Sequence, residues 1–403
     1  MVACAVAGCF FSYGFLLRVS PGVMVGDLMR EFGATALILG NLSAFYFYPY
    51  AVLQIPIGLW MDRTGPRATM TLACAVVALG CYVFASSESL QCAYAGRFLI
   101  GIGCALTWPG FLMVVHQWFP SRFAFLAGIG QVGAMLGGIL GQAPLAAAVG
   151  RYGWQNTMLA LAATGVFLSV ALSLSVRNRV MTSQVNEGSW HSLKTVMREP
   201  HSWFAAVFSL SMAAQILAFG GLWGVPFLSL AYGIERTSAA GIVSLMFAGS
   251  ALGAVLTGWW SDRTSTREIP MMVSALLCLG AGCSVIIIPD WPLPILSALT
   301  LLWGLGTGGL VLGFAVAREA NPSNASGLVV GLVNTFVVGS GAVFQLLIGF
   351  LLDFKWQGAI ENGVRLYASD HYRLALMSLM VVVVIGMACV VGIRVSRTAS
   401  QQL

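Results

Sequence analysis

The chain has 403 residues, of which 58% are apolar and only 8% are Asp, Glu, Lys or Arg, whereas a soluble globular domain carries about 25% charged residues. This composition excludes a water-soluble monomer. The net charge of +6 is modest, and an uneven distribution of basic residues across a bilayer accounts for it. No nucleic-acid partner is therefore expected.

The apolar stretches are long enough to cross a bilayer, because about 20 helical residues at 1.5 Å each cover roughly 30 Å of hydrocarbon. Only helices and closed barrels satisfy their backbone groups in lipid, and these stretches are too long and too uniformly apolar for barrel strands. We therefore predict an all-α integral membrane protein whose first helix is retained rather than cleaved as a signal peptide. The twelve predicted transmembrane helices lie near residues 2–28, 36–60, 69–87, 92–115, 123–149, 155–175, 203–229, 238–260, 270–289, 294–316, 326–352 and 373–393.

The first predicted span contains a charge. Arg18, in the stretch YGFLLRVSPG, lies too deep in the span to reach the interface easily. A charged side chain at the bilayer centre costs at least about 2.5–3.5 kcal/mol, so such a residue is a functional hypothesis by default. Two interpretations are open: Arg18 binds a substrate or counter-charge, or it is a structural residue bound to carbonyls freed near Pro21.

The second predicted span carries a polar and aromatic stripe. Tyr46, Tyr50, Gln54 and Gly58 recur every four residues, so they share one face of a helix. Such a stripe is poorly suited to face lipid. We expect it to line a cavity.

The fourth predicted span contains the second buried cation. Arg97 begins the stretch AGRFLIGIGCALTWPG and shares a helix face with Gly101, Cys104 and Trp108. Arg97 is closer to the end of its span than Arg18 is, so its side chain can also extend to the interface. It either lines the cavity with Trp108 or anchors the helix at the membrane surface.

Later spans carry uncharged polar residues at membrane depth. In the fifth span, Gln131 shares a face with Met135, Gly138 and Gln142, which fits either ligand contact or close helix packing. Further candidates either line a cavity or form an interhelical hydrogen bond worth about 1 kcal/mol. These candidates are Gln215, Asn334 and Gln345.

A loop motif occurs twice. GLWMDRTGPR (residues 58–67) returns 200 residues later as GWWSDRTSTR (residues 258–267). This repeat predicts two related six-helix bundles with a site at their interface near the bilayer midplane. The predicted organisation is an N-terminal bundle over 1–175, a linker with a short surface helix over 176–201, a C-terminal bundle over 202–394 and a tail over 395–403.

Basic residues fall unevenly on the two sides of the predicted membrane. Of the twenty Lys and Arg, twelve lie on one side and six on the other. The positive-inside rule assigns the richer side to the cytoplasm, and an even number of spans places both termini there. All fourteen acidic residues lie in connections or at span ends, so the two buried arginines have no carboxylate partner in the interior. An anionic ligand would supply one.

The duplicated loop resembles the signature loop of the major facilitator superfamily, and the resemblance covers the whole chain. It implies the major facilitator fold of two pseudo-symmetric bundles, in which the loop Asp faces a helix N-terminus of the opposite half and locks the inner side. A carboxylate is favoured there by about 0.3–1 kcal/mol. A merely positive inner turn is the alternative. The gating residues so implied are Asp62, Arg63 and Arg67, and in the second copy Asp262, Arg263 and Arg267.

The segments FSYGFLLRVSPGVMVGDLMREFG, LGNLSAFYFYPYAVLQIPIGLWMDRTGPR and GRFLIGIGCALTWPGFLMVVHQWFPSRFAF resemble the anion:cation symporter branch, which carries sialic acid, glutamate and sugar acids. That resemblance implies that Arg18 and Arg97 bind an organic anion. Two proton-carrying carboxylates of the branch are replaced here, by Leu17 and Cys104. His116 and Asp27 are weak substitutes, so coupling to a proton or another ion stays open.

These observations predict a secondary transporter, not an enzyme, that moves a small organic anion, with a carboxylate as the best fit, by alternating access. A facilitator or exchanger of another small metabolite, neutral or amphipathic, is an alternative, and so is a non-transporting sensor on the same scaffold. The chain has no convergent metal-ligand cluster and no phosphate-binding loop, so neither a metal nor a cofactor is expected. We expect a monomer in a bacterial inner membrane.

Overall fold

The computed structural model describes residues 1–178, 189–322, 325–361 and 364–401. The side chains of several segments within these ranges, including Asp62 and Arg63, lie outside the described residues. Twelve helices in the described part are long and apolar enough to cross a membrane. The predicted all-α membrane fold is therefore confirmed.

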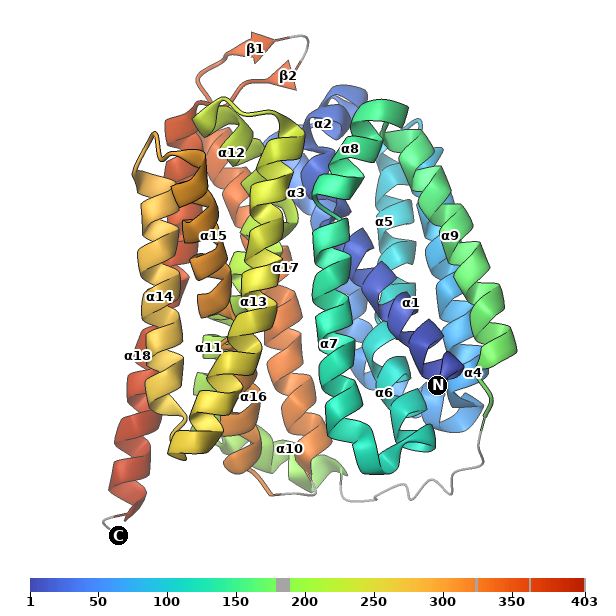
Figure 1. Cartoon of the computed structure of the whole chain (residues 1–403), viewed down its shortest axis with the longest axis vertical. Helices are drawn as coiled ribbons and strands as arrows, with labels where there is room; N and C mark the ends of the chain where they lie inside the picture. The colour runs from blue at the N-terminus through green and yellow to red at the C-terminus, as the bar shows by residue number, and fades with distance from the viewer. Residues whose placement is uncertain (179–188, 323–324, 362–363, 402–403) are drawn as a thin grey trace.

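The helices form two groups that stand side by side (Figure 1). The first group consists of α1 (Val2–Val19), η1 (Ser20–Val23), α2 (Val25–Phe32), α3 (Ala36–Ala44), α4 (Phe47–Ala85), α5 (Leu90–Cys104), α6 (Thr107–Trp118), η2 (Pro120–Arg122), α7 (Phe123–Leu140), α8 (Ala143–Tyr152) and α9 (Trp154–Ser175).

The second group is preceded by α10, the short helix predicted in the linker. Helix α10 spans Ser189–Arg198. The second group itself consists of α11 (Pro200–Ala214), the π-helical segment η3 (Gln215–Trp223), α12 (Gly224–Tyr232), α13 (Arg236–Thr264), α14 (Glu268–Ile287), α15 (Leu293–Thr307), α16 (Leu310–Glu319), α17 (Ser326–Lys355) and α18 (Ser369–Gln401). A two-stranded hairpin, β1 (Ile360–Glu361) and β2 (Val364–Arg365), lies between α17 and α18.

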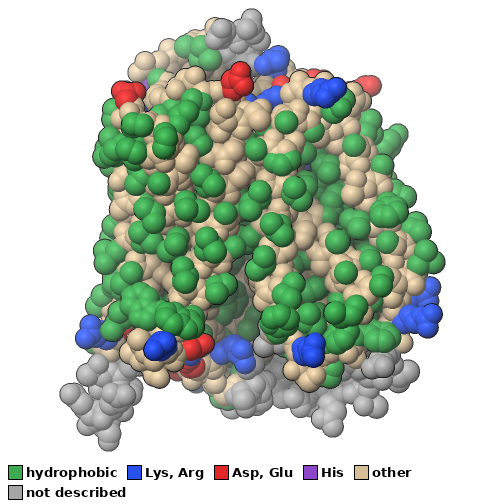
Figure 2. Space-filling view, in the orientation of Figure 1, with side chains coloured by type: hydrophobic (Ala, Val, Ile, Leu, Met, Phe, Trp, Pro, Cys, Tyr) green, Lys and Arg blue, Asp and Glu red, His purple; other side chains and the backbone are tan. Residues whose placement is uncertain are grey.

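The molecule has two distinct ends. We call the end that carries β1 and β2 the hairpin end, and the opposite end, with α10 and the C-terminus, the linker end (Figure 1). In Figure 2 the charged side chains gather near these two ends, and the broad surface between them is hydrophobic. This is the distribution that a bilayer requires, because isolated charges are costly in hydrocarbon.

Several spans break near their middle instead of running as one helix. The predicted span 36–60 is divided between α3 and α4 at Phe45 and Tyr46, and the predicted span 92–115 is divided between α5 and α6 at Ala105 and Leu106. Close packing accompanies the breaks: a Cβ atom added to Gly101 would collide with the carbonyl oxygen of Tyr46. The breaks bring Tyr46 and the end of α5 together around the two buried arginines.

The duplicated loop turns differently in its two copies. Gly65 has φ 75° and ψ 165°, a region that is essentially restricted to glycine. Ser265 has φ 53° and ψ 25°, a left-handed conformation that a small polar residue can adopt. The local backbone therefore explains why the first copy has Gly where the second has Ser.

Candidate functional site

Arg18 lies in the last turn of α1 among aromatic rings, with only 7% of its surface exposed. Its guanidinium carbon is 4.7 Å from the ring centroid of Phe15, 5.5 Å from that of Tyr46 and 5.0 Å from that of Tyr50. Its Nε donates to the Tyr46 hydroxyl at 3.3 Å. Within the described part of the chain, its two terminal nitrogens donate to no other group, so they are available to a ligand.

Arg97, in α5, is fully buried, and both of its terminal nitrogens are bound to the protein backbone, whereas its Nε has no partner in the described residues. One terminal nitrogen donates to the Leu17 carbonyl at 2.9 Å and the other to the Ser43 carbonyl at 3.3 Å. Its guanidinium also lies 5.2 Å from the Tyr46 ring centroid. Arg97 therefore ties α5 to α1 and α3, and its side chain does not extend to a membrane surface.

The positive charge of this pair has no acidic partner in the described residues. None of the ion pairs in that part of the chain includes Arg18 or Arg97. Leu17 and Cys104, which occupy the two positions where a carboxylate is expected by resemblance, are both fully buried. Uncompensated charge in a low-dielectric interior attracts an anion.

Three other candidates of the first half, Tyr50, Trp108 and Gln131, lie in different surroundings. Tyr50 stacks on Tyr46, with centroids 5.9 Å apart. Trp108 lies against Phe11 of α1, with centroids 5.0 Å apart. Gln131 is exposed on α7. Of the stripe predicted in the second span, Tyr46 and Tyr50 lie beside Arg18.

The candidates of the second half divide into two kinds. Asn334 donates to the Gln54 side-chain oxygen at 3.1 Å and thereby joins α17 to α4 across the two halves. Gln215 donates to the Leu379 carbonyl at 2.9 Å, and Gln345 donates to the Leu217 carbonyl at 2.7 Å. Gln215 and Gln345 therefore form interhelical hydrogen bonds within their own half.

The halves are sealed on the hairpin side of Arg18. Gly22 lies one helical turn after Arg18, and a Cβ atom added to it would be 2.8 Å from the carbonyl oxygen of Gly221. Beside this contact, the buried Gln142 side chain donates to the Gly220 carbonyl at 2.7 Å. The two halves are therefore in backbone contact between Arg18 and the hairpin end.

A lock between the halves lies at the hairpin end itself, and our sequence reasoning missed it. The N-terminus of α3 is capped from the second half: Leu37 N–H donates to Asp353 Oδ2 at 2.9 Å, and Ala36 N–H donates to the Tyr367 hydroxyl at 2.9 Å. Tyr367 in turn donates to Asp353 Oδ1 at 2.5 Å. Burial raises the pKa of Tyr367, which keeps it a neutral donor. The only sequence signal was an acid at the end of the predicted span 326–352.

A second cross-half contact strengthens this end. Arg236, at the start of α13, forms an ion pair with Asp27 of α2 at 2.5 Å. Asp27, a weak candidate for proton coupling, therefore has a basic partner from the opposite half.

The motif residues at the linker end contact only their own halves in the described structure. Arg67 Nε donates to the Ser173 carbonyl at 2.8 Å. Arg267 bridges Asp262 at 2.7 Å and Glu319 at 2.9 Å, and its hydrogen bond with Asp262 raises the pKa of Arg267. Arg263 lies over the Trp259 ring at 5.5 Å, and the side chains of Asp62 and Arg63 lie outside the described residues.

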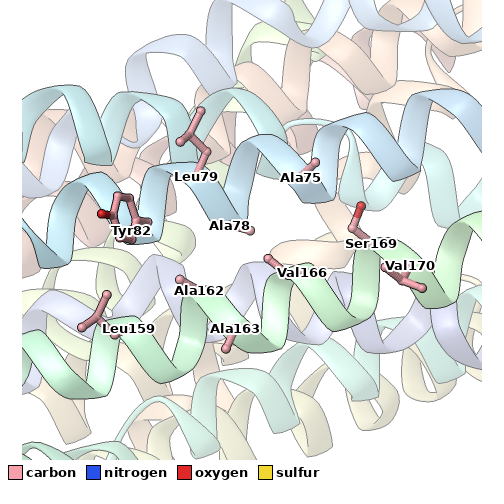
Figure 3. A pocket seen from close by; sticks show the side chains of 10 residues that line it. All are labelled: Ala75, Ala78, Leu79, Tyr82, Leu159, Ala162, Ala163, Val166, Ser169 and Val170. Carbon is pink, nitrogen blue, oxygen red and sulfur yellow. The ribbon is translucent and has the colours of Figure 1, made fainter.

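The face of the molecule seen in Figure 2 is hollowed near one end. Figure 2 shows the surface hollowed between the two halves in its lower part, toward the linker end. A different groove, between α4 and α9, is lined by mostly apolar side chains such as Leu79, Val166 and Val170 (Figure 3). It contains none of the predicted site residues, and its rim is exposed apolar surface, which suits lipid contact. Within the described residues, no group of three His, Cys, Asp or Glu is placed to hold a metal ion.

Comparison with known proteins decides the family. The family model described as Major Facilitator Superfamily matches residues 6–344. The chain belongs to this superfamily. It is therefore an integral membrane transporter and not an enzyme, as the duplicated loop predicted.

Individual relatives are distant but cover most of the chain. The chain is 22% identical to a probable galactarate/D-glucarate transporter of Bacillus subtilis (strain 168), over 92% of this chain and 89% of the relative. It is 23% identical to a gentisate transporter of Corynebacterium glutamicum, over 88% and 81%. A solved structure of a bacterial homologue of the human lysosomal transporter Spinster, inward-facing and unoccupied, matches with TM-score 0.80 at 16% identity, covering 98% of this chain and 96% of that one.

Proposed function

We propose that the chain is a secondary transporter that moves a small organic anion, a carboxylate, by alternating access. The observation that carries this proposal is Arg18: a buried guanidinium in the first half with two unengaged terminal nitrogens and no acidic partner in the described residues. The fork of those nitrogens matches a carboxylate in a bidentate pair. Relatives named for galactarate, D-glucarate and gentisate support the same class of solute.

The second arginine has a different role in this proposal. Because Arg97 is bound to the Leu17 and Ser43 carbonyls, we assign it to positioning α1 and α3, and not to direct contact with the solute. Tyr46 lies between the two cations and holds the Arg18 side chain through its hydroxyl. Tyr50, Gln54 and Asn334 then lie on the linker side of Arg18 along the proposed solute path.

Alternating access requires two closures. We propose that residues 1–175 and 202–394 rock against each other, joined by 176–201, and that residues 395–403 are a cytoplasmic tail. In the present state the hairpin end is closed by the α3 cap and by the Asp27–Arg236 pair. The motif loops, including Asp62, Arg63, Arg67, Asp262, Arg263 and Arg267, would close the linker end in the other state.

The bias of basic residues supports a cytoplasmic linker end, with both termini inside a bacterial inner membrane. With Leu17 and Cys104 at the two positions of interest, we propose that coupling does not use a carboxylate there. Facilitated movement or exchange fits the described site without a further residue.

Thermal stabilisation of the purified protein tests the proposal. A ligand at 100 times its Kd raises the free energy of unfolding by about 2.7 kcal/mol. We expect a carboxylate to raise the Tm of the wild type and of Arg30→Gln, in which an exposed arginine is removed, but not that of Arg18→Gln. Stabilisation by neutral or cationic metabolites that survives in Arg18→Gln would refute the proposal. Uptake into proteoliposomes then separates a transporter from a sensor, because a sensor binds without moving the solute.

A further inference from the structure

Three hydroxyl groups of the first and fourth spans donate to backbone carbonyls three or four residues earlier, and the Tyr46 hydroxyl donates to the Gly14 carbonyl of α1, whereas the buried Ser43 hydroxyl has no partner in the described residues. Ser12 donates to the Gly8 carbonyl at 3.0 Å, and Ser20 donates to the Leu17 carbonyl at 3.0 Å. Thr107, whose side chain lies close to α1, donates to the Cys104 carbonyl at 2.7 Å. A polyhydroxylated solute would lose its bonds to water here and regain few, and buried polar groups without partners cost free energy.

The surfaces that remain beside Arg18 are aromatic. Phe15, Tyr46 and Tyr50 present ring faces to its guanidinium. From the second half, Phe247 meets Phe15 edge-on, with centroids 6.4 Å apart. Further along α1, Phe11 packs against Trp108 of α6. We call these six aromatic side chains, Phe11, Phe15, Tyr46, Tyr50, Trp108 and Phe247, the aromatic wall. Aromatic rings pair well with other rings in stacked or edge-on geometry.

In the described site, Arg18 is the cation whose two terminal nitrogens are both free. Arg97 cannot serve a second carboxylate while both of its terminal nitrogens are bound to backbone carbonyls. A polar donor also lies at Gln54, one helical turn beyond Tyr50 and about 6 Å along the axis. The Gln54 side-chain nitrogen is buried without a partner, as are Arg97 Nε and the Ser43 hydroxyl. The Gln54 nitrogen can serve a single polar substituent.

We infer that the solute is an aromatic monocarboxylate, such as a hydroxybenzoate, and not a polyhydroxylated sugar diacid. The inference rests on the proposed function, because it assumes that Arg18 binds the carboxylate. The carboxylate takes the two terminal nitrogens of Arg18, the solute ring packs against the aromatic side chains around Arg18, and a ring substituent faces Gln54. Sequence identity does not decide between the two classes, since relatives named for a sugar diacid and for gentisate are about equally distant.

Calorimetric titration of the full-length protein in detergent tests this inference on the wild type. The probes are 4-hydroxybenzoate, cyclohexanecarboxylate, galactarate and 4-hydroxybenzyl alcohol. We expect 4-hydroxybenzoate to bind at least about 10-fold more tightly than cyclohexanecarboxylate, because ring pairing adds to apolar burial. Galactarate and the alcohol should bind still more weakly.

Two variants test whether the aromatic wall causes the preference for 4-hydroxybenzoate over cyclohexanecarboxylate. Tyr50→Leu should remove the 10-fold preference for the aromatic ring, whereas Tyr48→Leu, an aromatic residue of the same helix that is 38% exposed, should keep it. Galactarate binding as tightly as 4-hydroxybenzoate in the wild type would overturn the inference and leave anion transport intact. If the alcohol binds as well as the acid, or if no carboxylate binds in an Arg18-dependent way, the proposed function fails together with the inference.

Discussion

Asp353→Asn should loosen the hairpin end without unfolding the protein. The Asp353 carboxylate accepts a hydrogen bond from Leu37 N–H at the start of α3 and another from the Tyr367 hydroxyl. Hydrogen bonds to a charged group contribute about 1.5–3 kcal/mol, and a carboxylate at a helix N-terminus adds up to about 2 kcal/mol when partly buried. Asparagine keeps an acceptor but removes the charge. We therefore expect closure to weaken by about 1.5–3 kcal/mol, or roughly 10- to 150-fold in population.

Amide hydrogen exchange measures this change directly. The amides of Ala36 and Leu37 exchange only when the cap opens, so their protection should fall by the same factor. Glu88→Gln is the matched control, because it removes an exposed acid at the same end that has no contact with α3 in the described structure. Equal protection of these two amides in Asp353→Asn and in the control would refute the claim that Asp353 holds the halves together.

Three further predictions concern contacts inside and between the halves. Gly22→Ala should weaken closure of the hairpin end by about 1–3 kcal/mol through overpacking. Gly26→Ala, with nothing within 4 Å of its added Cβ, should leave the protection of the same amides unchanged. Unchanged protection in Gly22→Ala would show that the halves are not tightly packed at Gly22. Arg97→Lys should lower the Tm, because an ammonium cannot keep both carbonyl bonds and losing one costs about 1.5–3 kcal/mol, and an unchanged Tm would contradict the positioning role. Reversing the ion pair as Asp27→Arg with Arg236→Asp should recover most of the closure lost in either single variant, and a double variant as open as the singles would contradict the pairing.

Residues such as Arg18 could be predicted from the sequence because hydropathy is a local property. An arginine inside an apolar stretch is conspicuous whatever surrounds it, since burying a charge in hydrocarbon is costly. The repeated loop around Asp62 and Asp262 could likewise be recognised in the sequence, and it indicated the correct family. The breaks at Phe45 and Ala105 were not predicted, because they depend on how closely neighbouring backbones pack.

The amino-acid sequence by itself determined that the chain lies in a bilayer, how many spans it has, that a loop motif is repeated and that two cations are buried. Each of these properties follows from composition and from the spacing of residues. Only the tertiary structure decided that Arg97 is bound to the backbone while Arg18 is available, and that Asp353 caps a helix 316 residues away in the sequence. The reason is physical: whether a donor is free depends on which acceptors lie within about 3 Å of it, and those acceptors come from segments that only folding brings together.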